Sequence, residues 1–403
     1  MGAEGKTMKW IERKYYLDQL KRVRGTPDIK VITGVRRSGK SRLVESFVDF
    51  IRSTDQTANV TYIDLTDLSF ERLLDYHRLN DYIEDRYERG KSNYLFVDEV
   101  QLCPKFELTI NSLHSSGKYD IYITGSNAFL LGSDLATLFT GRTFEIEVFP
   151  FSLPEFMDYY SLSDPYEAYE RFLIEGGMAG SYAYTSTDEK YQYIADVFDT
   201  LIIRDIRQKY KIRNIALMDR VTDFLLDNIS NLSSARSIAD SLTGNRDAVN
   251  HKTVSAYMAY LCNAFAFYIV RRYDIRGKKY LSSNHKYYLS DHAFRYAKLG
   301  TKNLDYGRMI ENIIAIDLLR RGYELYAGIL YRREIDFVAI RRDEKLYIQV
   351  SDNISDPKTF AREVDPLLQI KDAYPKIIIA RTRHESYQYE GIKIVDVSNW
   401  LIG

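Results

Sequence analysis

Short apolar runs alternate with segments of helical periodicity over the first 150 residues of the chain. The apolar runs predict strands at residues 29–33, 60–65, 93–98, 120–124 and 143–149. After the first of these, apolar side chains recur at helical spacing from Leu43 to Ile51, and an amphipathic helix over 10–24 precedes it. Strands that alternate with helices predict an α/β fold with a doubly wound parallel sheet, assigned here to residues 1–150.

The pattern changes twice after this region. Residues 151–213 carry helical periodicity. Residues 214–290 predict helix, helix, turn, helix and then a hairpin of two strand-like runs, which is the layout of a winged helix-turn-helix. Residues 305–403 return to a mixture of helices and strands. The chain is therefore expected to divide into four parts.

A glycine-rich loop follows the first strand directly and leads into a helix. It reads Gly34-Val-Arg-Arg-Ser-Gly39-Lys40-Ser41, the pattern G-x-x-x-x-G-K-[ST] in its strand–loop–helix context. The glycines let backbone N–H groups fold around a polyphosphate, Lys40 places a cation on the outer phosphates, and the Ser41 hydroxyl reaches Mg²⁺. The sequence therefore predicts that ATP and Mg²⁺ bind at Gly34, Val35, Arg36, Arg37, Ser38, Gly39, Lys40, Ser41 and Arg42.

Two carboxylates end the strand expected at 93–98. Asp98 is predicted to hold Mg²⁺ through the coordination shell of the ion. Glu99 is predicted to orient and deprotonate the attacking water. The strand at 120–124 ends in small polar side chains up to Asn127, which can hydrogen-bond the γ-phosphate or the water. They can equally cap a helix that begins near Ala128. These groups are expected together, because α/β sheets bind ligands at the carboxyl ends of their strands.

These segments together resemble a known family. The glycine-rich loop, Phe-Val-Asp-Glu-Val-Gln at 96–101 and Ile-Thr-Gly-Ser-Asn at 123–127 are similar to AAA-type P-loop ATPases of bacteria and archaea. The similarity is greatest to the group that carries a C-terminal domain of unknown function. It implies the sheet of the additional-strand class, with residues 1–150 as the P-loop ATPase core and 151–213 as a helical lid over the nucleotide.

The resemblance also assigns roles to single residues. It implies a first sensor at Thr124 to Asn127, and it makes Arg142 the candidate arginine near the γ-phosphate, in cis or toward a neighbouring chain. The alternative for Arg142 is a surface charge that opens the strand beginning at Thr143. Lys40, Asp98, Glu99, Asn127 and Arg142 are therefore the predicted catalytic set.

The winged-helix layout raises the question of DNA. Its recognition helix would begin with Asn250, His251, Lys252, Ser255 and Tyr257, and its wing would carry Arg276, Lys278 and Lys279. These side chains can contact the phosphates of double-stranded DNA and base edges. A structural spacer or a contact with a protein partner is the alternative, because few cations lie on the expected face.

Residues 305–403 resemble the core of restriction-endonuclease-like domains. Glu311 on a helix, Asp336 on a strand and Gln349 on the next strand follow the order of that core. Such enzymes need a lysine two residues after the last of these, and Ser351 stands there instead. The three side chains are expected to hold a metal weakly at most, so a decayed nuclease fold that serves recognition is favoured over a nuclease.

Composition adds little to this picture but excludes some classes of function. Fifty-six basic residues balance 56 acidic ones, so net charge announces neither a nucleic-acid nor a membrane partner. Two distant cysteines and the lack of an apolar run of membrane-spanning length predict a reduced, cytoplasmic protein. The favoured function is slow ATP hydrolysis coupled to a conformational switch. The alternatives are a DNA-associated regulator or defence factor that senses ATP, and an ATP-gated nuclease.

Overall fold

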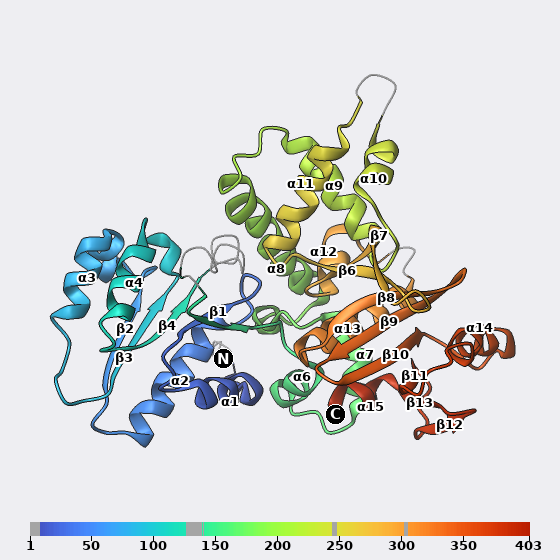
Figure 1. Cartoon of the computed structure of the whole chain (residues 1–403), viewed down its shortest axis with the longest axis horizontal. Helices are drawn as coiled ribbons and strands as arrows, with labels where there is room; N and C mark the ends of the chain where they lie inside the picture. The colour runs from blue at the N-terminus through green and yellow to red at the C-terminus, as the bar shows by residue number, and fades with distance from the viewer. Residues whose placement is uncertain (1–8, 126–138, 140, 244–247, 302–304) are drawn as a thin grey trace, which may run out of the picture. The chain divides into compact units, whose positions relative to one another are not determined.

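The computed structural model describes residues 9–125, 139, 141–243, 248–301 and 305–403. Within these ranges the chain forms two compact units, Trp10–Val148 and Phe149–Gly403, and Lys9 belongs with the second. Figure 1 shows the elements of each unit, labelled in chain order.

The first unit is built on a five-stranded sheet in the order β2-β3-β4-β1-β5, and every neighbouring pair is parallel. Its strands are β1 (Ile29–Thr33), β2 (Asn59–Asp64), β3 (Asn93–Asp98), β4 (Asp120–Thr124) and β5 (Thr143–Glu147). Its helices are α1 (Lys14–Val23), α2 (Lys40–Thr54), α3 (Tyr76–Glu84) and α4 (Phe106–Ser115), with short 3₁₀ turns at Leu68–Leu74 and Val100–Leu102. The position of β4 between β1 and β3 confirms the additional strand, and the parallel sheet confirms the P-loop α/β fold.

The central strands contribute to two cores, one on either face of the sheet. On β1, Ile29 and Val31 pack with the cluster that includes Leu79 of α3 and Ile110 of α4. Ile32 faces the other way, into the cluster with Phe47 of α2. Strands buried on both faces read as continuous apolar runs, which is why the sequence located them closely.

The second unit joins helices to an eight-stranded sheet of order β12-β13-β11-β10-β9-β8-β6-β7. Its strands are β6 (Phe267–Asp274), β7 (Lys279–Leu289), β8 (Glu324–Leu330), β9 (Arg333–Arg341), β10 (Glu344–Ser351), β11 (Lys376–Ala380), β12 (Tyr387–Tyr389) and β13 (Ile392–Asp396). Its α-helices are α6 (Leu153–Tyr160), α7 (Pro165–Glu175), α8 (Thr187–Thr200), α9 (Ile215–Asp227), α10 (Ala235–Leu242), α11 (His251–Asn263), α12 (Ala293–Leu299), α13 (Tyr306–Arg320), α14 (Pro357–Leu368) and α15 (Val397–Ile402). A 3₁₀ turn at Ala179–Ala183 and a π-helix at Leu201–Gln208 complete it.

The β6–β7 hairpin differs from the expected wing. The three preceding helices and the hairpin occur in the predicted order, but β6 pairs in parallel with β8, from Arg271 opposite Tyr326 to Asp274 opposite Ile329 (Figure 1). The hairpin is therefore one edge of the C-terminal sheet. Residues 149–403 form one compact unit, so the boundaries expected at 213/214 and 290/305 fall inside it and stay predictions.

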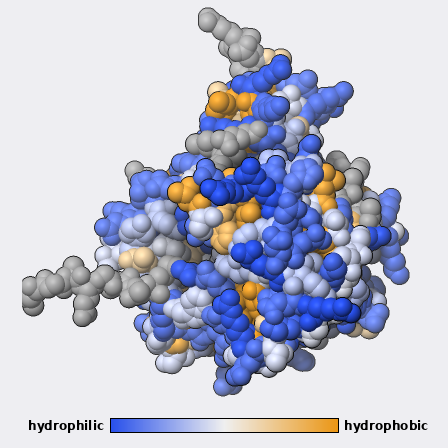
Figure 2. All heavy atoms as spheres, turned by 90° about the vertical axis from the view of Figure 1, so that its left-hand side faces the viewer, coloured by the Kyte–Doolittle hydropathy of each residue, from blue (hydrophilic) through white to orange (hydrophobic). Residues whose placement is uncertain are grey.

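The described helices include none that is long and apolar enough to cross a membrane. Hydrophilic side chains dominate the face drawn in Figure 2, where apolar ones lie in small separate patches.

Candidate nucleotide-binding site

The loop between β1 and α2 is a tightly curled glycine-rich turn. Gly34 has a φ of +133°, and a Cβ added there would lie 2.2 Å from the carbonyl oxygen of Val148. Gly39 caps α2 in the left-handed region at a φ of +95°, and Arg37 is also left-handed. Only glycine tolerates the first of these positions, because the backbone of the segment after β5 touches it. The loop therefore offers its backbone N–H groups at the amino end of a helix.

The side chain of Lys40 lies inside this turn. Its side chain is buried, and its ammonium donates to the carbonyl oxygens of Gly34 at 2.9 Å and Val35 at 3.1 Å. The ammonium is thus held in the centre of the loop curl, where a phosphate group bound by the loop would meet it. The prediction that Lys40 belongs to the loop site has this geometry in its favour.

Asp98, Ser41 and Thr124 meet at the carboxyl ends of β1, β3 and β4. The Asp98 carboxylate accepts hydrogen bonds from the Thr124 hydroxyl and from Ser41. Burial raises the pKa of Asp98, while these two hydrogen bonds act against the rise. A buried carboxylate beside a serine hydroxyl gives two hard oxygen ligands in one place, which suits Mg²⁺ with phosphate oxygens completing its shell.

Glu99 lies next to this group in an unusual backbone conformation. Its φ of +53° is left-handed, which is uncommon for a residue with a side chain. Its N–H donates to Thr124 Oγ1 and Asp98 Oδ1, both at 3.1 Å, and its carboxylate accepts from Gln101 Nε2 at 2.5 Å. The strained turn separates the directions of the two adjacent carboxylates, so Asp98 faces Ser41 while Glu99 is held by Gln101.

Arg13 belongs to the site although sequence reasoning missed it. It is buried just before α1, donates from Nη1 to the carbonyl oxygen of Ser38 at 2.7 Å, and lies 4.6 Å from the centre of the Tyr16 ring. An arginine at the start of an amphipathic helix carries no signal that points to a loop 25 residues away. Arg42, which the sequence included, is exposed and pairs with Glu45 at 2.7 Å.

Arg142 lies at the opposite end of the strands from the glycine-rich loop. Because β1 and β5 pair in parallel from Ile29 opposite Thr143 onward, Arg142 precedes the amino end of β5, and its carbonyl oxygen accepts from the Ile29 N–H at 2.9 Å. Gly34 follows the carboxyl end of β1, roughly 16 Å away along the strands. This distance argues against a role in cis. Contact with a neighbouring chain and a surface charge that opens β5 remain the two interpretations. Asn127 lies outside the described residues.

The comparisons with known proteins agree with this geometry. The model of a family described as "AAA domain" matches residues 26–157, and a domain of unknown function matches residues 166–305. An uncharacterized protein of Haemophilus influenzae is 35% identical over 397 residues, covering 97% of this chain and 98% of its own. The chain belongs to the family of this Haemophilus protein. An uncharacterized protein of Methanocaldococcus jannaschii is 26% identical and covers 80% of this chain and 74% of its own.

The matched AAA domain contains Gly34 to Ser41, Asp98 and Thr124, so this chain carries a nucleotide-binding unit of the ATPase type. Two solved structures share a weaker likeness. AMPPCP-bound DnaA from Aquifex aeolicus is 14% identical, with a TM-score of 0.33 over 63% of this chain and 89% of that one. The Aeropyrum pernix Orc1 protein in complex with DNA is 13% identical, with a TM-score of 0.31 over 72% and 93%. TM-scores this low support no conclusion about ligands.

In the second unit of the protein, the residues predicted to form a nuclease-like core surround a lysine. Lys286 of β7 is buried, and its ammonium lies 2.7 Å from Glu311, 2.5 Å from Glu334 and 3.5 Å from Asp336. Sequence reasoning missed this lysine, which lies in the hairpin and far from the C-terminal strands in sequence. It occupies the place between the carboxylates where a metal ion would be expected.

Gln349 forms hydrogen bonds with other groups of this cluster. Its carbonyl oxygen accepts from the Asp336 N–H at 2.7 Å, and its amide donates to Glu363 at 3.0 Å. The described residues hold no group of three or more His, Cys, Asp or Glu side chains arranged for a metal ion. The cluster is therefore best described as a buried ion-pair network that joins β7, α13 and β9.

The predicted recognition helix is α11, and its residues differ in exposure. Asn250 caps it by accepting from the Lys252 N–H at 2.8 Å, and His251, Lys252 and Ser255 are exposed. Tyr257 is buried instead, with its hydroxyl 3.4 Å from the Asn214 carbonyl oxygen. Tyr257 thus packs in the helical core and is not available to DNA.

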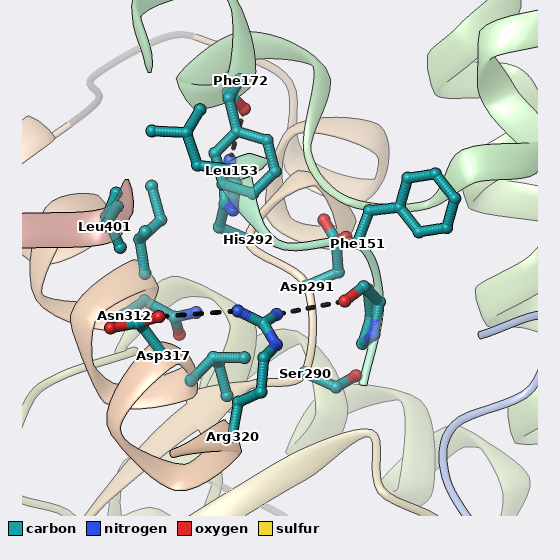
Figure 3. A pocket seen from close by; sticks show the side chains of 13 residues that line it. Phe151, Leu153, Phe172, Ser290, Asp291, His292, Asn312, Asp317, Arg320 and Leu401 are labelled. Carbon is teal, nitrogen blue, oxygen red and sulfur yellow. Dashed lines mark hydrogen bonds and ion pairs between the residues drawn. The ribbon is translucent and has the colours of Figure 1, made fainter. Parts of the chain in front are cut away.

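A small cavity lies in the second unit, between α13 and the segment that begins at Phe149. Its volume is about 20 Å³, room for roughly one water molecule. Arg320 reaches across it and donates to the Pro150 carbonyl oxygen at 3.1 Å, and it lies 3.7 Å from Asp317 (Figure 3). The cavity is too small for a ligand, but it marks the polar junction that holds the start of this unit.

Proposed function

We propose that the protein binds ATP with Mg²⁺ and hydrolyses it slowly, as a nucleotide-driven switch that serves a partner of the second unit. The observation that carries this proposal is the meeting of Ser41, Asp98 and Thr124 directly beside the curled loop of Lys40. Binding alone needs only the loop. Hydrolysis also needs a water-orienting carboxylate, and Glu99 supplies one.

Each group has a distinct part in this proposal. Lys40 exchanges its two loop carbonyl partners for outer phosphate oxygens. Ser41 and Asp98 hold Mg²⁺, which neutralises charge on the phosphates when it is bound. Glu99 takes the proton of the attacking water.

Thr124 links the Asp98 carboxylate to the backbone of Glu99, because its hydroxyl donates to Asp98 and accepts from the Glu99 N–H. A change in the charge around Asp98 is therefore transmitted to the backbone that orients Glu99. Arg13, on the carbonyl oxygen of Ser38, adds a second cation at the loop and favours the negative charge of a polyphosphate.

The lid role of residues 151–213 belongs to this proposal as well. Duplex-DNA contact through Lys252, Arg276, Lys278 and Lys279 stays a prediction of the winged-helix layout, and it competes with the single-stranded partner inferred below. An ATP-gated nuclease is disfavoured, because the ammonium of Lys286 already neutralises the carboxylates that a metal would need. A DNA-associated regulator that only senses ATP differs from the favoured function in one measurable respect, which is turnover.

Phosphate release from the full chain with Mg²⁺ and ATP tests the proposal, with duplex DNA titrated in. We expect slow release that Lys40→Ala abolishes. Tight ATP binding without any release supports the state-sensor alternative. ATP binding that Lys40→Ala leaves unchanged overturns the assignment of the site.

A further inference from the structure

The tip of the β6–β7 hairpin and the β8–β9 turn form one continuous surface on the second unit. The N–H of Ile275 donates to the Ile329 carbonyl oxygen at 3.0 Å, which extends the parallel pairing of β6 and β8 up to the two turns. The guanidinium of Arg276 then lies 5.2 Å from the ring centre of Tyr331. We call residues 275–280 and 331–333 the tip surface.

The tip surface is basic in a chain that is neutral as a whole. Its two segments read Ile-Arg-Gly-Lys-Lys-Tyr and Tyr-Arg-Arg, so they contain five cations and no carboxylate. The cations are Arg276, Lys278, Lys279, Arg332 and Arg333, and all are exposed. Among the described residues, only Arg333 has an ion-pair partner, the exposed Asp365 at 3.4 Å. Four cations without an ion-pair partner on two adjoining turns create a local positive potential, which the flanking carboxylates of Asp274 and Glu334 offset in part.

A fifth strand adds to this charge. Lys345 of β10 lies 5.3 Å from the Tyr273 ring centre, on the aromatic row behind the hairpin. Burial lowers the pKa of Lys345, and the nearby charge of Lys278 lowers it further, although Asp372 acts in the other direction. Lys345 therefore lies close enough to Lys278 for their charges to interact, with Asp372 beside it to offset part of this charge.

Two tyrosines of the tip surface are largely exposed. Tyr280 is 62% exposed and Tyr331 is 65% exposed, although large aromatic side chains usually bury most of their area. Tyr280 leans on Tyr326, with ring centres 5.0 Å apart, so it is supported from behind while its outer side stays open. The two rings offer flat apolar surfaces between the cations.

Tyr331 is held there at a conformational cost. It occupies the two-residue turn between Leu330 and Arg333, and its φ is +58°. Such turn positions favour glycine or asparagine, and a bulky residue at positive φ is a true outlier. Apart from the contact with Arg276, the exposed ring adds little burial to folding, which favours a role in recognition.

From these observations we infer that the tip surface binds single-stranded nucleic acid, with phosphates on the cations and unpaired bases stacked on Tyr280 and Tyr331. Interleaved cations and exposed aromatic rings are what unpaired strands require, because every base has a face that stacks and every nucleotide a charge. A duplex satisfies the cations equally well, but its bases are already stacked and leave the rings without a partner. Single-stranded nucleic acid would then be the partner that the ATP switch serves. This biological role rests on the proposed function, whereas binding of the strand to the tip surface does not.

Fluorescence anisotropy of a labelled oligothymidine of about 15 nucleotides tests the inference on the full chain. We expect the affinity for this strand to exceed that for a duplex of the same length. Replacing both Tyr280 and Tyr331 by Ala should weaken binding by roughly tenfold or more per ring, whereas replacing both by Phe should change it little. Lys278→Ala with Lys279→Ala should flatten the log-log salt dependence by roughly 1.4, the share of two phosphate contacts.

Matched controls lie on the far edge of the same sheet. Tyr387→Ala on β12 and Lys393→Ala on β13 remove an exposed tyrosine and an exposed lysine outside the tip surface, and should leave affinity and salt dependence unchanged. Circular dichroism of each variant confirms its fold. Equal weakening by the control variants, or unchanged binding by the Ala pair at Tyr280 and Tyr331, overturns the inference. So does a preference for duplex, or competition by polyglutamate as strong as that by oligothymidine.

Lys40→Ala separates this inference from the proposed function. The variant should lose ATP binding and still bind the oligonucleotide in the absence of nucleotide. A wild-type chain that binds ATP but no strand refutes the tip surface alone, and a chain that binds the strand but no ATP refutes the switch alone.

Discussion

At the residue scale, Lys40 illustrates how a buried charge can be held ready for a ligand. Two carbonyl oxygens accept from its ammonium, and these are neutral partners that a phosphate easily replaces. The same logic applies to Arg13 on Ser38, whereas Arg42 points to solvent and to Glu45. Position within the loop sequence therefore does not by itself predict which cations reach the phosphates.

Lys40→Ala is expected to lower ATP affinity by at least tenfold, because a charge-assisted contact to the outer phosphates is lost. Isothermal titration calorimetry measures this directly. Arg42→Ala is the matched control, since it removes an exposed cation two residues further along, and it should bind ATP like the wild type. Equal loss in both variants would show that net charge near the loop, and not the placement of Lys40, sets the affinity.

Glu99→Gln is expected to separate binding from hydrolysis. The amide keeps the size and the contact with Gln101 but takes no proton, so affinity for ATP with Mg²⁺ should persist while turnover falls by roughly 10²-fold or more. Phosphate release under saturating ATP is the measurement. Glu71→Gln, an exposed carboxamide substitution in the same unit, should leave turnover unchanged. Normal turnover by Glu99→Gln would assign the water to another residue.

At the element scale, the sequence located the first unit better than the second. Three strands of the parallel sheet are largely buried apolar runs beside a motif, so β1, β3 and β4 begin and end where the pattern predicts. The pairing of β6 with β8 joins segments about 50 residues apart, and no local pattern encodes that choice. The hairpin was therefore predicted as a hairpin but not as an edge of the C-terminal sheet.

The same limit explains which site residues were found. Asp98 and Thr124 lie at strand ends, and Ser41 lies in the first turn of α2, at positions that a motif marks. Lys286 was missed, because only the tertiary fold brings β7 against Glu311 and Asp336. A buried lysine among carboxylates has no sequence signature.

Lys286→Met is expected to destabilise the second unit, by roughly 3–5 kcal/mol at pH 8, because it leaves buried carboxylates unpaired. The loss should be smaller at pH 5. Burial raises the pKa of Glu311 to about 7 even though Lys286 lowers it, so without the ammonium this carboxyl accepts a proton readily. A pKa that is raised in the folded state gives stability that is present at low pH and lost as pH rises through that pKa.

Urea denaturation of Lys286→Met and the wild type at pH 5 and pH 8 measures this difference. Lys286→Met combined with Glu311→Gln removes the most buried unpaired charge and should recover part of the loss at pH 8. An equal loss at both pH values would mean that packing of the lysine stem, and not charge, dominates.

At the scale of the whole molecule, the chain itself connects the nucleotide loop to the second unit. The Val148 N–H donates to the Thr33 carbonyl oxygen at 2.9 Å, and the Val148 backbone touches Gly34, so the end of the first unit rests on the loop. The next three residues are fixed to the second unit. The Phe151 N–H donates to the Gly177 carbonyl oxygen at 2.8 Å, and Arg320 holds Pro150 (Figure 3). A displacement of the loop thus has a covalent path into the second unit that is only a few residues long.

Arg320→Ala is expected to uncouple the two units without affecting the nucleotide site. It removes the donor to Pro150 and the guanidinium 5.8 Å from the Phe149 ring centre, so residues 149–151 lose their hold on α13. Arg321→Ala is a closely matched control, because Arg321 pairs with the same Asp317, at 2.8 Å, but donates to the Trp400 carbonyl oxygen and not to this segment.

Hydrogen exchange of residues 149–151 and of α13, with and without ATP, gives the readout. In the wild type and in Arg321→Ala, ATP should change the hydrogen-exchange protection of α13. In Arg320→Ala, residues 149–151 should exchange faster and the protection of α13 should no longer respond to ATP. Calorimetry should show unchanged ATP affinity for this variant. A full response of α13 in Arg320→Ala would show that the nucleotide signal reaches the second unit by another route than the segment after β5.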